Sequence, residues 1–483
     1  MTGVIKLTGA TSNLGSHWKT INWKKVKAEV KRLQVRIAKA VQEGKTNKAK
    51  SLQWVLSHSY SAKLLAVKMA TSTKGARTAG VDGVKWNTPA KKMRGVLSLK
   101  RRGYKARPLR RVEILKKNGK KRPLGIPTIK DRAWQALHLL TVQPVAETTA
   151  DSNSYGFRFY RACRDAISQC FCALAKTYSP KWILEADIKA CFDWIDHDWL
   201  MDNILIDKKM LSQWLKCGFV QQGKLYPTKA GTPQGGIISP TMANMTLDGL
   251  EQAVKESCPP RRKVNFVRYA DDFICTAESK ELIENNIIPA INEFLRPRGL
   301  MLSPEKTKIV RIEQGFDFLG QNLRKYRNKL ITTPSKENKK SFLDGIRKEI
   351  KNCRGSKTED MITRLNPKIR GWVNYHKHIQ SARAFSHAST VIFEALMRWA
   401  RRRHPDKGPG WIKKKYFTLT GRKWVFSCKS KQQKGKYKIH ELLKPSEAKL
   451  YRYIKIKGKA NPFNPEYREY FQMRRLLSNT VAI

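Results

Sequence analysis

Two adjacent carboxylates, Asp271 and Asp272, lie between two short apolar runs of the chain. Residues 264–267 precede the pair and residues 273–275 follow it, and both runs are rich in β-prone side chains. Such a pattern predicts a β-hairpin with the acidic pair at its tip. Neighbouring carboxylates repel each other unless a cation or water lies between them, and divalent Mg²⁺ prefers oxygen ligands. The pair therefore indicates a metal-binding hairpin or, taken alone, an ordinary polar turn.

Two further stretches bear on the same chemistry. The apolar stretch Lys181–Ile188 carries an acid, Asp187, near its end, as expected for a strand that leads into a site. Ala230–Pro240 is a glycine-rich loop that we expect to open a helix. Each stretch is a weak signal alone. Their order and spacing along the chain, together with the acidic pair, make a specific combination.

The charge balance predicts a polyanionic partner. The chain has 97 Lys+Arg against 38 Asp+Glu, a formal net charge of +59. Such an excess repels itself unless a polyanion is near, and nucleic acid is the polyanion we expect. A membrane surface is the alternative, but we find no run of about 18 apolar residues and no signal-peptide core. We therefore expect no membrane association and a cytoplasmic location in a bacterium.

Size and cysteine usage fit an intracellular multidomain protein. A length of 483 residues with 41% hydrophobic side chains predicts roughly three domains with real cores. The nine cysteines include no Cys-x-x-Cys pair, so we interpret them as reduced thiols.

The N-terminal part of the chain is predicted to form basic helices that follow a short flexible segment. We expect residues 1–20 to be flexible. Apolar positions then recur every three or four residues from Val26 to Val41, and a second helix follows through Leu56. This pattern predicts a helical hairpin with a solvated basic face, and the same face is a candidate RNA contact. Further on, residues 115–127 predict a basic hairpin with Asn-Gly at its tip.

Together these motifs resemble those of group II intron reverse transcriptases. The resemblance covers most of the chain, from about residue 22 to its end. One departure is Leu115, where members of the family often carry proline. The matching segments are Gly80–Gly83, Arg122–Pro127, Tyr155–Arg158, Gly231–Pro240 with Ala243-Asn244, Tyr269–Asp272, Gly299–Lys308, Phe318–Gly320 and Leu365–Tyr375.

The resemblance implies an α+β, right-hand polymerase fold: fingers, a palm with an antiparallel sheet, and a helical thumb. We expect a helical N-terminal extension over residues 1–75, fingers and palm over 76–330, the thumb or maturase domain over 331–418, and a small basic DNA-binding domain over 419–483. Many relatives end in a His-Asn-His nuclease. Beyond Tyr467 this chain runs only to Ile483, so we expect no nuclease domain and no strand cleavage by the protein itself; the alternative is a sequence truncated before such a domain.

The resemblance also implies the roles of the acids. Asp187, Asp271 and Asp272 would be catalytic and would hold two Mg²⁺ ions, with the backbone carbonyl of Ile188 as a further ligand. Two such ions can activate a primer 3′-hydroxyl and stabilise the leaving oxygen when it attacks an α-phosphate. Nearby acids such as Asp193 and Asp196 are expected to be structural.

A second group of residues is expected to bind the nucleotide. Lys116 and Arg122 would clamp the triphosphate by charge-assisted hydrogen bonds. Phe192, five residues after Asp187, stands where the family places an aromatic gate under the sugar. Gln234 and Gly235 would pack on the nucleotide and template. Lys306 is a candidate proton donor to the pyrophosphate, with charge neutralisation as the alternative.

The C-terminal part is strongly basic with interleaved aromatic residues. Basic side chains neutralise phosphates and aromatic rings can stack on bases, although most of these rings are expected to form a small core. The candidate nucleic-acid-binding residues are Arg370, Trp372, Arg401, Arg402, Arg403, Lys413, Lys414 and Lys415.

The function implied is RNA-directed DNA synthesis by a chain that also assists splicing of its group II intron RNA. Intron mobility would proceed by retrohoming through target-primed reverse transcription. The expected partners are the intron RNA, target DNA and deoxynucleoside triphosphates. The alternatives are a splicing-only maturase, against which the three intact acids argue, and a stand-alone reverse transcriptase. The segment Leu365–Tyr375 and the basic tail argue against the latter.

Overall fold

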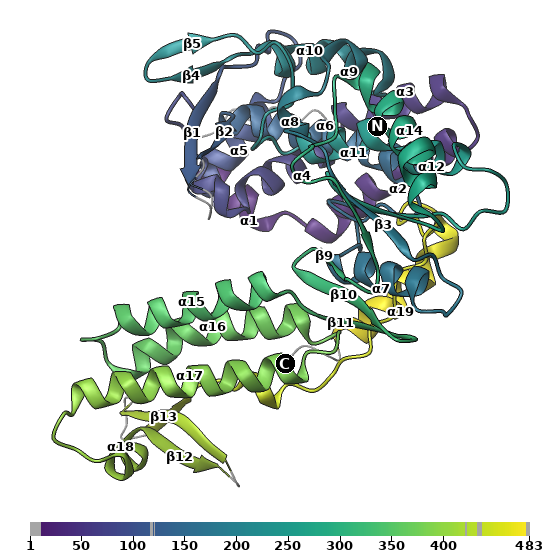
Figure 1. Ribbon diagram of the computed structural model, residues 1–483. Helices are drawn as coiled ribbons and strands as arrows, with labels where there is room; N and C mark the ends of the chain where they lie inside the picture. The colour runs from purple at the N-terminus through teal and green to yellow at the C-terminus, as the bar shows by residue number, and fades with distance from the viewer. Residues whose placement is uncertain (1–10, 116–118, 120, 421–422, 432–436, 480–483) are drawn as a thin grey trace. The chain divides into compact units, whose positions relative to one another are not determined.

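The computed structural model of the chain divides into two compact units (Figure 1). The first unit comprises Met1–Ala162, Leu184–Ile309 and Ile456–Ile483, and the second comprises Cys163–Ile183 and Val310–Lys455. The residues that the structure describes are 11–115, 119, 121–420, 423–431 and 437–479. The chain therefore leaves the first unit twice and returns to it at its C-terminal end.

In the first unit, the apolar repeat near the N-terminus forms the helix α2 (Trp23–Gln42). The helix begins where the side chain of Asn22 accepts a hydrogen bond from the backbone N–H of Lys25 at 3.0 Å, a standard N-cap contact. Val26, Val30 and Ile37 are buried at helical spacing. The predicted helix is therefore confirmed, with its polar face exposed.

The prediction of a flexible leader is wrong for its second half. Residues Thr11–Thr20 form the helix α1, which packs against α5 (Pro89–Ser98). Trp18 lies edge-on to Trp23 with ring centroids 5.1 Å apart, so aromatic packing rather than sequence periodicity orders this segment.

The helix α6 (Ile129–Thr149) is the central support of the N-terminal helices. It is buried almost all round, and α2, α3 (Thr46–His58) and α4 (Tyr60–Thr71) pack against it. Its N-cap is Thr128, whose Oγ1 accepts from the backbone N–H of Asp131 at 3.1 Å. Its buried polar residues, such as Asp131 and Glu147, have hydrogen-bond or ion-pair partners, as buried polar groups require.

A mixed sheet of four strands, in the order β2-β1-β4-β5, holds the predicted basic hairpin. β1 (Leu109–Leu115) pairs antiparallel with β2 (Lys121–Ile126), and Leu115 lies opposite Lys121. β4 (Phe219–Gln221) runs parallel to β1, and β5 (Lys224–Tyr226) pairs antiparallel with β4. The hairpin prediction is confirmed for its two strands.

A second sheet of four strands, in the order β6-β7-β3-β8, carries the predicted acids, and we call it the central sheet. Its strands are β3 (Trp182–Asp187), β6 (Asn265–Tyr269), β7 (Asp272–Ala277) and β8 (Lys308–Arg311). β6 and β7 form the predicted hairpin, with Tyr269 paired to Asp272 beside the turn. Phe266, Val267, Phe273 and Ile274 are fully buried, which ties the hairpin to the core.

The remaining helices of the first unit flank these sheets. They are short and connect the strands to the loops that carry polar motifs. They are α8 (Cys191–Trp194), α9 (His197–Asn203), α10 (Lys208–Lys216), α11 (Ser239–Leu247), α12 (Leu250–Glu256), α13 (Lys280–Leu282), α14 (Ile288–Leu295) and, after the return of the chain, α19 (Arg468–Asn479).

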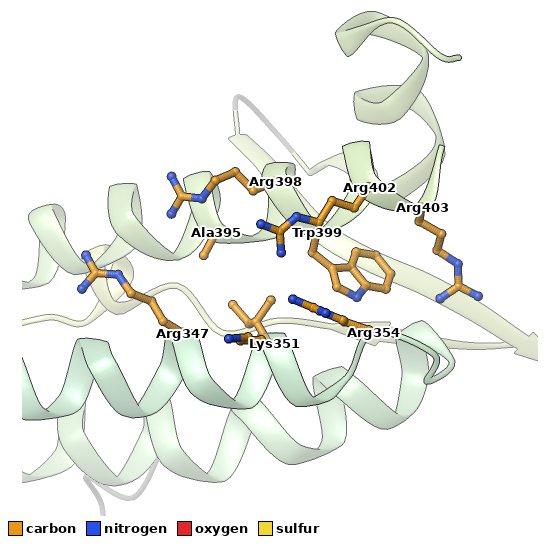
Figure 2. Close-up of a pocket in the computed structure, with 9 residues that line it drawn as sticks. Arg347, Lys351, Arg354, Ala395, Arg398, Trp399, Arg402 and Arg403 are labelled. Carbon is orange, nitrogen blue, oxygen red and sulfur yellow. The ribbon is translucent and has the colours of Figure 1, made fainter. Parts of the chain in front are cut away.

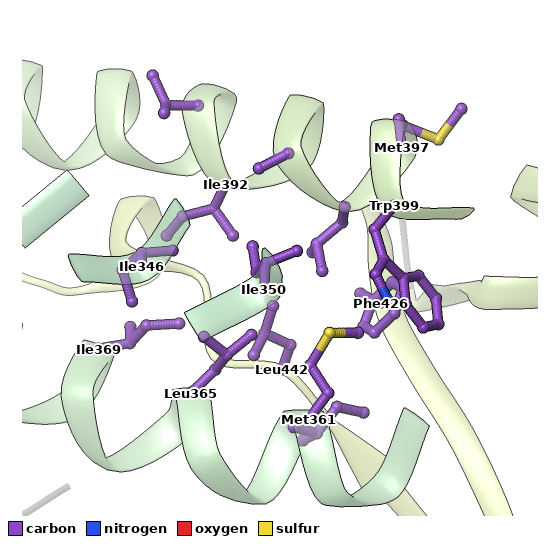
Figure 3. Packing of buried hydrophobic residues seen from close by; sticks show 14 of the residues in the cluster. Ile346, Ile350, Met361, Leu365, Ile369, Ile392, Met397, Trp399, Phe426 and Leu442 are labelled. Atoms are coloured by element: carbon purple, nitrogen blue, oxygen red, sulfur yellow. The ribbon is translucent and has the colours of Figure 1, made fainter. Parts of the chain in front are cut away.

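The second unit is built on three long helices, α15 (Lys336–Asn352), α16 (Thr358–His376) and α17 (Ala382–Arg403). Their apolar faces meet in one core, where Ile350, Leu365 and Ile392 interdigitate (Figure 3). Trp399 and Phe426 extend this core toward a small sheet. The other elements are α7 (Cys163–Leu174), β9 (Phe316–Phe318), β10 (Gln321–Tyr326), β11 (Lys329–Pro334), α18 (Pro409–Tyr416), β12 (Phe417–Thr420), β13 (Lys423–Lys431) and β14 (Tyr437–Glu441).

The C-terminal region, predicted as one domain over residues 419–483, is divided between the two units. Residues up to Lys455 belong with the three-helix core, and Ile456–Ile483 belong with the first unit. Phe417, Phe426 and Leu442 enter the helical core, so apolar burial attaches the small sheet to the bundle.

Among the described residues, no helix combines the length and the apolar character that a membrane crossing requires.

Candidate active site

The three predicted acids lie at one end of the central sheet. Asp187 ends β3, and the next residue, Ile188, donates its backbone N–H to the carbonyl of Asp271 at 3.3 Å. On the other side, the backbone N–H of Ser303 donates to the carbonyl of Asp187 at 2.8 Å. The turn itself contains Ala270 in the left-handed region, with φ of 60°. Backbone pairing therefore brings the hairpin acids beside Asp187.

Burial and mutual repulsion disfavour ionisation of the hairpin acids. The pKa of Asp271 is raised by burial first and then by the charge of Asp187. The pKa of Asp272 is raised by burial, by a side-chain hydrogen bond with Asp187 and by the charges of both other acids. A hydrogen bond between two carboxyl groups requires a proton on one of them. The site thus favours the uptake of positive charge.

Lys306 supplies part of that charge. Its Nζ donates to Asp187 Oδ2 at 2.6 Å, and this bond raises the pKa of the ammonium group. The loop that carries it is held by hydrogen bonds from the backbone N–H groups of Lys306 and Thr307 to the carbonyl of Ser303. Here Lys306 neutralises an acid of the site, which is the alternative that the sequence left open.

The acids suit Mg²⁺ by chemistry, because three carboxylates offer the hard oxygen ligands that this ion prefers. With the side chains as they lie here, the described part of the chain holds no group of three or more His, Cys, Asp or Glu arranged as metal ligands. One oxygen of Asp187 is taken by Lys306, and Asp272 is hydrogen-bonded to Asp187. In this arrangement the ammonium group of Lys306 places positive charge beside the carboxylates.

Gln234 connects the glycine-rich loop to its surroundings. Its Oε1 accepts from Arg122 Nε at 2.9 Å, and its Nε2 donates to both carboxylate oxygens of Asp193 at 2.9 Å. Its backbone carbonyl accepts from the N–H of Gly125 at 2.9 Å. Asp193, predicted as a structural acid, therefore orients a residue of the site.

Gly235 is required by its backbone geometry. Its φ of 129° is accessible to glycine and strained for other residues. A Cβ there would lie 2.6 Å from the carbonyl oxygen of Gly125. Replacement by any other residue would therefore push the loop away from β2.

Phe192 lies on the short helix α8, after Ala190 in the left-handed region with φ of 44°. Its ring is half-buried and lies edge-on to Phe157, with centroids 6.5 Å apart. A cavity of about 230 Å³ borders Phe192 and Gln234 and is also lined by Arg111. An aromatic wall beside a polar side chain and a cation suits a nucleotide better than a purely apolar ligand.

The remaining predicted nucleotide contacts differ in outcome. Arg122 is exposed, and its charge lowers the pKa of Asp271, which places it within electrostatic reach of the acids. Lys116 lies outside the described residues. Asp196 caps α9 by accepting from the backbone N–H of Trp199 at 2.7 Å, consistent with a structural acid.

Residues beneath the hairpin were missed by the sequence analysis. Arg268 is fully buried, and its Nη2 forms an ion pair with Asp248 Oδ1 at 2.7 Å. Its Nη1 donates to Asn244 Oδ1 at 3.2 Å and to the carbonyl of Ala270 at 3.4 Å. A charged residue at an otherwise apolar position of β6 is the signal that could have revealed this support.

A second buried pair lies nearby. Arg158 Nη2 forms an ion pair with Glu147 Oε2 at 2.9 Å, and both side chains are 5% exposed. Arg158 also donates to the backbone carbonyls of Asp151 and Ser154. The motif Tyr155–Arg158 thus fastens the chain beside the hairpin to α6.

In the second unit, basic residues of α15, of the turn that follows it and of α17 line a groove of about 520 Å³ (Figure 2). Trp399 and Ile350 form its apolar floor. We call it the basic groove. The cations that line it are Arg347, Lys351, Arg354, Arg398, Arg402 and Arg403. Two of them, Arg402 and Arg403, were predicted to bind nucleic acid, and the groove extends that surface to α15.

The other predicted nucleic-acid contacts are exposed except for Trp372. Arg370, Arg401 and Lys413–Lys415 are exposed on α16, α17 and α18. Trp372 is buried, stacks on Phe342 with centroids 4.3 Å apart, and donates its Nε1–H to Asn338 Oδ1 at 2.9 Å. Both the face and the polar edge of its ring are used internally, so its prediction as a nucleic-acid-binding residue is corrected to a core role.

Comparisons with protein-family models match three successive parts of the chain. Residues 18–99 match the N-terminal domain of reverse transcriptase. Residues 114–323 match reverse transcriptase (RNA-dependent DNA polymerase). Residues 339–417 match the group II intron, maturase-specific domain. The predicted order of polymerase and maturase segments is confirmed.

The chain is also similar to curated relatives, and a solved structure aligns with part of it. Protein YkfC of Escherichia coli (strain K12) is 30% identical over 327 residues, 57% of this chain and 85% of YkfC. Group II intron-encoded protein LtrA of Lactococcus lactis subsp. cremoris is 30% identical over 340 residues, 56% of this chain and 56% of LtrA. Telomerase from Candida albicans matches over 66% of this chain and 65% of that chain, with 12% identity and a TM-score of 0.38.

The chain thus spans only about half of the LtrA sequence but most of YkfC. With a reverse transcriptase domain followed by a maturase-specific domain, it belongs to the group II intron-encoded reverse transcriptase/maturase family and has the right-hand polymerase fold of reverse transcriptases.

Proposed function

We propose that this protein is an RNA-directed DNA polymerase that also binds a group II intron RNA, assists its splicing and drives its mobility by target-primed reverse transcription. The observation that carries the polymerase activity is the convergence of Asp187, Asp271 and Asp272 at one end of the central sheet. Family membership supports the coupling to an intron RNA.

Asp187, Asp271, Asp272 and the carbonyl of Ile188 would hold two Mg²⁺ ions. Bound there, the ions would supply Lewis-acid stabilisation of the attacking and leaving oxygens. Burial and then the charge of neighbouring acids raise the pKa of Asp271 and Asp272, and bound cations would offset the charge repulsion. Lys306, already hydrogen-bonded to Asp187, would then be free to meet the pyrophosphate.

The neighbouring residues would position a deoxynucleoside triphosphate. Arg122 is held by Gln234 at a distance where its charge reaches Asp271, so it can neutralise triphosphate oxygens. Phe192, supported by Phe157, would lie under the sugar and clash with a 2′-hydroxyl. Gln234 and Gly235 would pack against the base pair being formed.

RNA binding would use the second unit. In the described residues, no ion pair joins Lys351, Arg354, Arg398 or Arg402 to an acid, and all four side chains are exposed. A row of unpaired cations can neutralise successive phosphates. Target DNA would be a further ligand of the basic surfaces.

The test is the double substitution Asp271→Asn with Asp272→Asn, which keeps side-chain shape and removes charge. We expect loss of cDNA synthesis on a primed RNA template in Mg²⁺, with intron RNA affinity and splicing retained. Asp198→Asn, on an exposed acid of α9, is the matched control and should remain active.

Equal loss of splicing and polymerisation would contradict this separation of roles. A wild-type protein that promotes splicing but makes no cDNA would favour the splicing-only maturase.

A further inference from the structure

The last described segment of the chain, Ile456–Asn479, returns to the unit that contains the acids. We call it the C-terminal segment. Ile456, Ala460 and Phe463 within it are buried, so it is integrated into that unit. This segment lies in the region predicted to be a DNA-binding domain, and its apolar burial calls for another explanation.

Polar contacts anchor the C-terminal segment at three places. Arg161 Nη2 donates to the carbonyl of Gly458 at 2.6 Å. Asn461 Nδ2 donates to Thr148 Oγ1 of α6 at 3.0 Å. Lys31 Nζ of α2 donates to the carbonyl of Pro462 at 2.5 Å. The segment therefore joins the N-terminal helices to the region around residue 160.

Its aromatic residues contact one loop, residues 155–160. Phe463 lies edge-on to Phe159, with ring centroids 5.9 Å apart. Phe471 packs on Tyr160, with centroids 4.8 Å apart. These two ring contacts join the C-terminal segment to residues 155–160, which we call the 155–160 loop.

The 155–160 loop also contacts the β6–β7 hairpin and α11. The backbone N–H of Tyr155 donates to the carbonyl of Arg268 at 2.9 Å. Asn244 Nδ2 donates to the carbonyl of Gly156 at 2.7 Å. A Cβ on Gly156 would lie 2.5 Å from the backbone nitrogen of Ala270, so the two backbones are in close contact.

The loop has a conformation that its surroundings must hold. Phe157 and Tyr160 both lie in the left-handed region, with φ of 56° and 57°, where bulky L-residues are strained. Such strain persists only when neighbouring contacts fix the backbone. Phe157 from this loop is also the ring that lies edge-on to Phe192.

We propose that the C-terminal segment is a positioning element of the nucleotide site: it holds the 155–160 loop so that Phe157 supports Phe192 against the sugar. The inference rests on the proposed role of Phe192 as the sugar-selecting ring. Phe463 and Phe471 are then positioning residues, which act on selectivity through the 155–160 loop without touching the nucleotide.

The experiment is single-nucleotide extension on a primed RNA template, with deoxynucleotide and ribonucleotide compared by kcat/KM. Phe463→Leu removes the ring but keeps apolar volume, and Phe471→Leu does the same at the second contact. Each should lower the preference for deoxynucleotide by about twofold to tenfold, the range expected for losing an aromatic pair. Most of the effect should lie in KM.

Tyr467→Leu is the matched control. Tyr467 belongs to the same segment, and its described ring contact is with Tyr470. Phe157→Leu should lower the preference similarly, and combining it with Phe463→Leu should add little further loss. Phe471 is only half-buried, so its substitution decides the matter if Phe463→Leu compromises folding.

Phe192→Val distinguishes the sugar-selecting role of Phe192 from the positioning role of the C-terminal segment. If it changes sugar preference while Phe463→Leu and Phe471→Leu do not, the positioning role is refuted and the proposed gate stands. If Phe192→Val itself has no effect, the gate fails and the positioning role fails with it. Weakened binding of target DNA with unchanged sugar preference would also refute it and return the segment to a DNA-binding role.

Discussion

The buried ion pair between Arg268 and Asp248, beneath the β6–β7 hairpin, offers a sharp test of what supports the candidate site. Arg268→Met keeps the length of the side chain but removes its charge. Asp248 would then remain buried without its counter-ion, and the hydrogen bonds to Asn244 and Ala270 could no longer form. Breaking one partner of a buried pair costs about 3–5 kcal/mol.

The loss in free energy of unfolding caused by Arg268→Met depends on whether Asp248 becomes protonated. Burial already raises the pKa of Asp248 to about 6, with the charge of Arg268 acting in the opposite direction. Without Arg268 the pKa would rise further, and the carboxyl would take up a proton near neutral pH. Protonation limits the penalty, so we expect the lower end of the range, about 3 kcal/mol at pH 7.

The pH dependence has a definite sign. In the variant, the folded-state pKa of Asp248 exceeds its unfolded value of 3.8, so the folded state binds more protons between these values. Stability therefore rises as pH falls through the folded pKa. The destabilisation of Arg268→Met should shrink from pH 8 to pH 5.

Urea denaturation followed by tryptophan fluorescence would measure the change. Arg262→Met is the matched control, because its pair with Glu278 is exposed and should be worth at most about 1 kcal/mol. Adding Asp248→Asn to Arg268→Met should restore part of the lost stability. A loss no larger than that of the control, or strictly additive effects, would refute the reasoning.

Two further predictions concern the second unit. The affinity for the intron RNA should fall steeply as the salt concentration rises. The double substitution Arg398→Ala with Arg402→Ala in the basic groove should reduce the slope of log K against log salt by about 0.7–0.9 for each phosphate that is no longer neutralised. An unchanged slope would contradict RNA binding in this groove. His376 is fully buried, and burial lowers its pKa to about 4. Below about pH 6.5 the imidazole therefore binds a proton in the unfolded state before it does so in the folded state. The free energy of unfolding should fall on acidification, by about 2 kcal/mol at pH 5 from this group. His376→Gln should flatten this loss in a pH series of thermal unfolding, and equal acid sensitivity of both proteins would show that another group is responsible.

Short-range patterns carried much of the prediction. The β6–β7 hairpin follows from β-prone residues around an acidic pair, and α2 from an apolar repeat, because both patterns act within a few residues. The maturase helix α16 likewise contains the predicted segment Leu365–Tyr375. Family resemblance supplied roles for residues that these patterns place at turns and loops.

Contacts between distant residues could not be predicted in this way. Lys306 meets Asp187 across 119 positions of the chain, and Phe463 meets Phe159 although nothing local marks either ring. Trp372 shows the converse error. An aromatic residue in a basic segment suggests a nucleic-acid contact. The helical spacing of Trp372, however, places its ring in the core of the three-helix bundle.

The electrostatics of the first unit explain why its buried ion pairs cluster beside the acids. Burial and the nearby charge of Asp187 raise the pKa of Asp271 and Asp272, so ionising these two carboxyls destabilises this end of the sheet. The hairpin cannot relax by separating them, because backbone hydrogen bonds fix Ile188 to Asp271. Arg268 binds Asn244 of α11 and Asp248 directly after that helix, and Arg158 binds Glu147 of α6. These contacts hold the hairpin and the neighbouring backbone in place despite the repulsion. Bound cations would relieve this repulsion, which is why we propose the site as the place where Mg²⁺ binds.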